Sequence, residues 1–152
     1  MVETGEAELT GHDFIPFQSV AGLPVAGMTA HVVFSAFDPS QPATLSASVI
    51  CDVIRGLIGF EGLLLSDDLG MKALTGSFTE RASGCLKAGC DIALHCSGDL
   101  DEMEQVAAGS SLLSERALAS ITPLDAVRGR PRVEIDRTAV AFEVASLLEA
   151  AA

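Results

Sequence analysis

Basic residues are scarce in this sequence. Nine lysines and arginines stand against 21 aspartates and glutamates, which gives a formal net charge of −12. Nucleic acids and anionic membranes are bound through basic patches that neutralise phosphate groups. The charge balance therefore argues against both kinds of partner and favours a protein that binds neutral or small ligands.

The sequence also lacks long apolar runs and an amino-terminal targeting segment. No run approaches the ~20 apolar residues that a membrane-spanning helix needs. The first eight residues, MVETGEAE, are acidic and have no apolar centre, unlike a secretory signal peptide. We therefore expect a cytoplasmic protein that uses no membrane.

No two cysteines have the C-x-x-C spacing of redox or zinc motifs. The two nearest in sequence, Cys85 and Cys90, fall within a helical pattern. We expect all four cysteines to be reduced, buried, small apolar side chains, namely Cys51, Cys85, Cys90 and Cys96.

Three apolar segments are each followed by a helical pattern. They cover residues 25–34, 63–65 and 91–96, and they begin about 30–40 residues apart. This rhythm is typical of βαβ units, which form a parallel sheet in an α/β domain. A chain of 152 residues fits one domain, so we treat residues 1–152 as a single unit.

Helical periodicity precedes the first of these strands and fills the intervals between them. A weak pattern over residues 7–21 is interrupted by Pro16, and a clear one runs from the N-cap candidate Ser46 to Gly59. The apolar face of the second pattern consists of Val49, Ile50, Val53, Ile54, Leu57 and Ile58. A third helix is predicted over residues 80–89, capped by Ser77 or Thr79.

The last third of the sequence is predicted to be helical. One helix starts at residues 97–99, and helical patterns follow over residues 114–121, 124–127 and 137–150. The apolar stripe of the first of these helices is formed by Leu100, Met103, Val106 and Ala107.

Polar side chains stand at the ends of all three predicted strands: His31 on the first, Asp67 and Asp68 on the second, and His95 on the third. Functional residues of parallel α/β folds gather where the strands end, so we expect these side chains to meet on one face. Neighbouring residues of a strand point to opposite sides. One of the two aspartates should therefore face a pocket, and the other should face a helix or cap the loop.

Plainer interpretations of the same residues stay open. Both aspartates can be loop acids that bind nearby backbone amides, and each histidine can be a satisfied core residue. A metal site of His31, Asp67 and His95 lacks a diagnostic spacing, so we predict no metal. The turn at residues 96–98 opens a helix, which makes it a weak candidate for binding an anion or a sugar hydroxyl.

The segment GFEGLLLSDDLGM, residues 59–71, resembles the nucleophile segment of glycoside hydrolase family 3, in its bacterial β-N-acetylhexosaminidases. The likeness extends along nearly the whole chain. It includes MTAHV at 28–32, PATLS at 42–46, the pair ER at 80–81 and AGCD at 88–91.

This resemblance implies a fold, a reaction and a set of site residues. The fold is a partial (β/α)8 TIM-type barrel, of which this chain holds about three carboxyl-terminal βα units plus a helical tail. Asp67 matches the nucleophile of a retaining mechanism. Asp68 and Met71 would shape the loop beside the pocket, and His31 would line it. The implied substrates are terminal β-linked N-acetylglucosamine residues on recycled cell-wall fragments, and no cofactor is implied.

One departure from the family pattern is large. The acid/base histidine and the residues that grip the sugar belong to the first half of the family's barrel, and no segment here matches them. His12 does not occupy the acid/base position, so that role is not assigned to it. A full barrel needs about 250 residues. We therefore expect a carboxyl-terminal fragment.

A half-barrel would expose a strand edge and an apolar inner face, and such surfaces pair or aggregate unless they are covered. We accordingly expect self-association, or pairing with a missing amino-terminal half. The alternative to an enzyme is a non-catalytic barrel remnant that only associates or complements. The sequence has neither tryptophan nor tyrosine, which argues against a long open sugar-binding groove within this chain.

Overall fold

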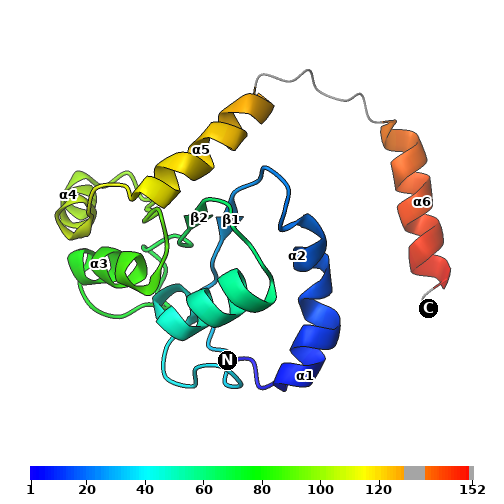
Figure 1. Ribbon diagram of the computed structural model, residues 1–152, viewed down its shortest axis with the longest axis horizontal. Helices are drawn as coiled ribbons and strands as arrows, with labels where there is room; N and C mark the ends of the chain where they lie inside the picture. The colour runs from blue at the N-terminus through cyan, green and yellow to red at the C-terminus, as the bar shows by residue number, and fades with distance from the viewer. Residues whose placement is uncertain (129–135, 151–152) are drawn as a thin grey trace.

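A small parallel sheet lies at the centre of the molecule, with helices around it (Figure 1). The computed structural model describes residues 1–128 and 136–150. Strand β1 (Gly27–Met28) runs parallel to β2 (Leu64–Leu65). A third segment joins the other edge of β2 through a parallel bridge between Leu65 and Ile92. The architecture is therefore α/β, as predicted.

The strands are shorter than the apolar runs predicted. The first prediction, residues 25–34, is wrong beyond Met28. Past this point the buried Thr29 hydroxyl bonds to Thr44 at 2.8 Å, and the Val33 carbonyl accepts the N–H of Val2. The chain therefore leaves the sheet after two residues.

The third predicted strand, residues 91–96, is reduced to the bridge at Ile92. Its backbone runs beside β2, since Ser66 N–H donates to the Ile92 carbonyl at 2.9 Å. Leu94 N–H, however, donates to the Ser66 hydroxyl at 2.9 Å. A side chain thus takes the place of a backbone carbonyl and ends the ladder. The described residues form no eight-stranded barrel, so the barrel stays a prediction.

The amino-terminal helical pattern is interrupted, as predicted, but it is broken into three pieces and the breaks lie before Pro16. They are α1 (Glu6–Glu8), the π-helical segment η1 (Leu9–Asp13) and α2 (Ile15–Val20). Pro16 lies in the first turn of α2, where a missing backbone N–H costs no helical hydrogen bond.

The second predicted helix begins near Ser46 and stops at Gly59, as expected. A short 3-10 turn, η2 (Ala43–Leu45), leads into the π-helical segment η3 (Val49–Leu57). The Ser46 hydroxyl accepts the N–H of Val49 at 3.2 Å, and Gly59 has a φ of 73°. The predicted apolar face is right for the buried Val49, Ile50 and Val53 but wrong for Leu57, which is 42% exposed.

Helices α3 (Phe78–Ala88) and α4 (Leu100–Gly109) pack side by side (Figure 1). Their contact is close at Gly109, where a Cβ atom would lie 2.3 Å from the Thr79 carbonyl oxygen. The predicted apolar stripe of α4 is wrong for Leu100 and Met103, which are exposed. Val106 of the same stripe is partly buried and packs against the core, as predicted.

The carboxyl-terminal region forms two helices. The predicted pieces over 114–121 and 124–127 are one helix, α5 (Glu115–Arg128), which continues through Pro123. Helix α6 (Arg137–Ala150) was predicted and stands apart from the other elements in Figure 1. Its large apolar side chains are exposed, namely Val140, Phe142, Val144, Leu147 and Leu148. No described helix is both long and apolar enough to cross a bilayer.

Two clusters of apolar residues make the core. The larger one packs Leu64 and Leu69 against α3, and the smaller one packs Leu9 and Phe14 against η3. Cys85 and Cys90 are buried in the larger cluster, as predicted. The prediction is wrong for Cys51 and Cys96, which are exposed.

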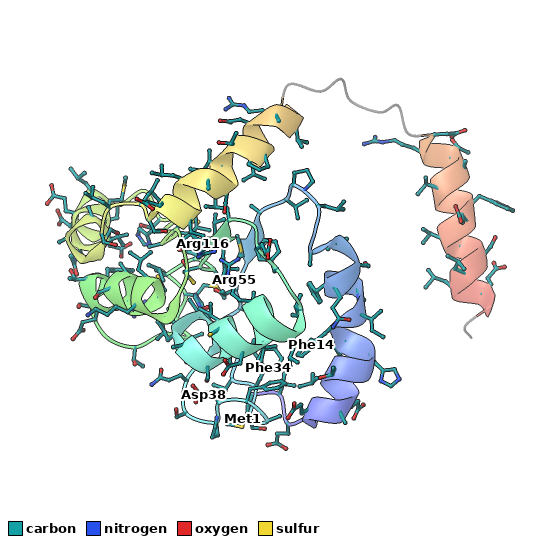
Figure 2. All side chains as sticks on the ribbon, in the orientation of Figure 1. Met1, Phe14, Phe34, Asp38, Arg55 and Arg116 are labelled. Carbon is teal, nitrogen blue, oxygen red and sulfur yellow. The ribbon has the colours of Figure 1, made fainter. Side chains whose placement is uncertain are left out.

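The buried carboxylate of Asp91 holds the third segment beside β2 at their amino ends. Asp91 accepts hydrogen bonds from Leu64 N–H at 2.9 Å, from Arg55 at 3.0 Å and from Arg116. The second guanidinium nitrogen of Arg55 donates to two further carbonyls, those of Phe60 and Gly62. Burial and then the neighbouring Arg116 lower the pKa of Arg55. Figure 2 shows Arg55 and Arg116 close together in the middle of the molecule.

Ser77 is predicted to stabilise α3 through its cap. Its hydroxyl accepts the N–H of Glu80, and the Glu80 carboxylate accepts the Ser77 N–H at 2.8 Å, which forms a capping box. Ser77→Ala should lower the free energy of unfolding by about 1 kcal/mol, measured by urea denaturation. Ser111→Ala, in an exposed loop, is the matched control, and equal losses in both variants would contradict a capping role.

Asp38 is predicted to make stability depend on pH in the acid range. Its carboxylate accepts hydrogen bonds from Ser40, Gln41 and Ser46. These bonds, the Ser40 hydroxyl first, lower the pKa of Asp38 from 3.8 to about 2. Because the folded pKa is depressed, this contribution is fully present above pH 3.8 and is lost as the pH falls through about 2.

Asp38→Asn should therefore lower the Tm at pH 7, and its difference from the unmodified chain should narrow between pH 4 and pH 2. Thermal unfolding followed by circular dichroism measures both. A difference that stays constant across this range would show that the Asp38 charge does not stabilise the turn.

Candidate functional site

Asp67 lies just past the carboxyl end of β2, where the chain enters the loop toward α3. Its side chain is half-buried, and its Oδ1 accepts the N–H of Asp68 at 2.8 Å. Within the described part of the chain, Asp67 Oδ2 receives no hydrogen bond. The carboxylate is thus held by one oxygen and free at the other.

Asp68 connects this loop to neighbouring segments through hydrogen bonds. Its Oδ1 accepts the N–H of Gly70 at 2.9 Å and that of Cys96 at 3.1 Å. Its carbonyl oxygen accepts hydrogen bonds from the N–H of Met71 at 3.1 Å and from Nε2–H of the His31 ring at 2.9 Å. Of the two aspartates, Asp68 is the one that caps the loop.

His31 links the loop to β1 and η2. Its Nε2 lies 2.9 Å from the Asp68 carbonyl oxygen, which only accepts, so Nε2 carries a proton. In the neutral ring, Nδ1 then accepts the hydroxyl of Thr44 at 2.8 Å, and Thr44 accepts the hydroxyl of Thr29 at 2.8 Å. Three elements are tied together by this line of hydrogen bonds, which fixes the ring of His31.

His95 lies on the other side of Asp68. Its side chain is only 4% exposed, and its Nδ1 lies 3.5 Å from Asp68 Oδ1. Its Nε2 is 2.9 Å from Glu102 Oε2, and its ring lies 4.8 Å from the ring of Phe78, centroid to centroid. The structure therefore brings both histidines to Asp68, as predicted from their positions at the strand ends. Among the described residues, Asp67 forms no hydrogen bond with either ring.

Met71 is 44% exposed and lies one turn further along the loop. The loop is held from α3 by Arg81, whose guanidinium donates to the Leu69 carbonyl at 2.7 Å and to the Gly76 carbonyl at 3.1 Å. Sequence reasoning gave no such role to Arg81, and it missed Thr44 and Glu102 as partners of the two histidines. Hydrogen-bond partners so far apart in the chain leave no local pattern.

The two cavities described for this molecule lie away from Asp67. One, of about 830 Å³, is lined by Arg55, Arg116 and the segment before β1. The other, of about 440 Å³, is apolar and lies beside β1. Neither of these two cavities is lined by Asp67.

Two alternative binding sites find little support. The amino end of α4 is already occupied, since Asp99 accepts the N–H of Glu102 and the Ser97 hydroxyl donates to the Glu102 carboxylate. These carboxylates disfavour a further anion at residues 96–98. Among the described residues, no group of three or more His, Cys, Asp or Glu side chains is arranged to hold a metal ion.

Comparison with known sequences places the chain in a family. The sequence profile described as the glycosyl hydrolase family 3 N terminal domain matches residues 1–122. A β-hexosaminidase of Alkalilimnicola ehrlichii is 41% identical over 129 residues, which cover 83% of this chain and 36% of the relative. One from Stenotrophomonas maltophilia is 39% identical over 118 residues, covering 75% of this chain and 35% of the relative.

Solved structures give the same result. The β-N-acetylglucosaminidase of Thermotoga maritima aligns with a TM-score of 0.64 and 31% identity, over 86% of this chain and 31% of that one. NagZ of Neisseria gonorrhoeae, in complex with N-trifluoroacetyl-D-glucosamine, aligns with a TM-score of 0.68 and 28% identity, over 84% of this chain and 40% of that one.

The chain thus spans about a third of the length of the curated relatives named above. The profile match covers more than half of its 152 residues and includes the whole loop from Asp67 to Met71. The chain belongs to glycosyl hydrolase family 3.

Proposed function

We propose that this chain carries the nucleophile segment of a retaining β-N-acetylhexosaminidase, with Asp67 as the nucleophile. The observation that carries the proposal is the placement of Asp67 at the end of β2, with one oxygen held by the Asp68 N–H and the other free. The names of the relatives point to the same activity, and one solved neighbour binds an N-acetylglucosamine derivative.

The proposed chemistry begins with attack by Asp67 Oδ2 on the anomeric carbon of the sugar. The bond to the aglycone oxygen breaks as a general acid protonates that oxygen, and an ester links the sugar to Asp67. Water then hydrolyses this ester and restores the carboxylate. Holding Oδ1 through a backbone N–H fixes the direction of Oδ2, which is what an aimed nucleophile requires.

The neighbouring residues have supporting roles in this proposal. Asp68 and Met71 shape the loop beside the sugar, and His31 lines the same side of the site. The substrate is a terminal β-linked N-acetylglucosamine residue, as on cell-wall fragments recycled in the cytoplasm, and no cofactor takes part. The general acid comes from outside these 152 residues.

Asp67→Asn is predicted to abolish hydrolysis of 4-nitrophenyl N-acetyl-β-D-glucosaminide. The assay uses this chain alone and mixed with the part of the Alkalilimnicola ehrlichii relative that it does not match, made as a separate polypeptide. General acid catalysis alone is worth about 10²–10⁴-fold, so release of nitrophenol should need both pieces. Loss of the nucleophile should then lower kcat by about a thousandfold or more.

Asp52→Asn, an exposed change on η3, is the control and should leave the rate unchanged. Asp68→Asn should give an intermediate rate, because it loosens the loop and keeps the nucleophile. Equal rates for Asp67→Asn and the control would refute Asp67 as the nucleophile. Absence of hydrolysis from every mixture would refute the proposed activity.

A second candidate function is that of a self-associating or complementing module. The supporting observation is the open edge of β1, which has no strand partner other than β2 among the described residues. Beside this edge lies the apolar cavity of about 440 Å³, lined by Phe14, Phe17 and Val20 on one side and by Met28 on the other. Figure 2 shows Phe14 between η3 and the amino-terminal helices.

The side chains that line this cavity are mostly apolar, as in the layer between a helix and a sheet. Its α2 residues, Phe17 and Val20, are exposed, as is Met28 on the strand. A further strand paired to the open edge of β1 would place apolar side chains against them. Strand addition of this kind obtains its affinity from main-chain hydrogen bonds and its specificity from side-chain pockets.

Met28→Lys is predicted to reduce association through this edge. Sedimentation velocity should show species larger than the monomer for the unmodified chain as its concentration rises, and fewer for the variant. A lysine on an edge strand opposes strand pairing. Leu112→Lys, at an exposed loop position, is the matched control. If Met28→Lys associates as the unmodified chain does, the edge of β1 is not the interface.

A further inference from the structure

His95 is held between two carboxylates in the interior of the molecule. Its side chain is 4% exposed, with Glu102 Oε2 at 2.9 Å from Nε2 and Asp68 Oδ1 at 3.5 Å from Nδ1. Nδ1 is a buried polar atom without a hydrogen-bond partner among the described residues. An unpaired buried nitrogen costs stability, so its position beside Asp68 needs an explanation.

The hydrogen bonds around Glu102 determine where the ring proton lies. Glu102 Oε2 accepts the hydroxyl of Ser97 at 2.6 Å and lies 2.9 Å from His95 Nε2. The Ser97 oxygen lies 2.8 Å from the same nitrogen and, with its proton given to Glu102, can only accept from it. An ionised carboxylate only accepts, so Nε2 carries a proton. The opposite nitrogen, Nδ1, faces Asp68 Oδ1 at 3.5 Å. Two acceptors do not bind each other, so this contact is attractive only when Nδ1 also carries a proton, and the ring then forms an ion pair with both carboxylates.

Asp68 transmits this contact to Asp67. The same oxygen that faces His95 accepts the N–H groups of Gly70 and Cys96, and the backbone N–H of Asp68 holds Asp67 Oδ1. A displaced Asp68 carboxylate would release the N–H groups of Gly70 and Cys96 and so loosen the loop backbone that orients Asp67.

We propose that His95 is a positioning residue for Asp67, which acts through Asp68: its ring joins Glu102 on α4 to the loop that carries the nucleophile. The catalytic meaning of this inference rests on the proposed function. The placement of His95 between Glu102 and Asp68 does not, because it is a property of the folded chain. Packing alone does not account for it, since a phenylalanine would fill the same space against Phe78.

The test compares His95→Phe, which keeps a ring against Phe78, with His95→Gln, which keeps one donor. Hydrogen exchange measured by NMR follows the amides of Asp68, Gly70 and Cys96. We expect exchange to be about tenfold faster in His95→Phe than in the unmodified chain. In His95→Gln the rate should lie between these two values, because only one of the two carboxylates is then held. The Ile50 amide, which donates to the Ser46 carbonyl, should keep its rate.

The ring nitrogens give an independent signature. In the unmodified chain, ¹⁵N shifts should show a proton on His95 Nε2, and the Nε2–H signal should broaden in Glu102→Ala. The same His→Phe change at the exposed His12 is the matched control and should alter neither readout.

Unchanged loop exchange in His95→Phe, or an Nε2 without a proton, would overturn the proposal. In the two-piece assay, His95→Phe should lower kcat about tenfold with KM within about twofold, since the nucleophile is misdirected while the sugar still binds. If the two-piece assay shows no turnover at all, the proposed function fails while the exchange and ring signatures still decide the role of His95 in the loop.

Discussion

The buried carboxylate of Asp91 is the constraint on which the arrangement of this molecule depends. It accepts hydrogen bonds from the backbone of β2, from Arg55 on η3 and from Arg116 on α5. Removal of Asp91 would leave the guanidinium of Arg55 beside Arg116 without a counter-charge, and a loss of this kind costs about 3–5 kcal/mol in buried ion pairs. Asp91 thus aligns the third segment with β2 at the amino ends, and this alignment brings Asp68 and His95 together four residues later.

The two adjacent aspartates divide the tasks of the loop between them. Asp68 uses its carboxylate and its carbonyl to bind the loop, the third segment and His31. Asp67 is left with one oxygen free, at the end of a strand whose position the core determines. Asp68 thus fixes the loop, while Asp67 beside it keeps one oxygen available. An aimed nucleophile requires this arrangement.

Both candidate functions require further contacts that cover the exposed apolar surfaces of this chain. The open edge of β1, the apolar cavity beside it and the uncovered helix α6 all call for further contacts. The chain spans about a third of its curated relatives, and a strand that covers the β1 edge would extend the sheet toward the rest of such a domain.

The sequence by itself determined what depends on neighbouring residues: a cap at Ser77 or Thr79, the stop at Gly59, a strand within residues 63–65 and the motif around Asp67 that marks the family. Only the tertiary structure decided where β1 and the third segment end, because the Thr29 and Ser66 side chains form hydrogen bonds with partners far away in the chain. It also decided that Cys51 and Leu100 face outward and that His95 meets two carboxylates. Burial and pairing of this kind depend on which elements pack together, and no local pattern records that.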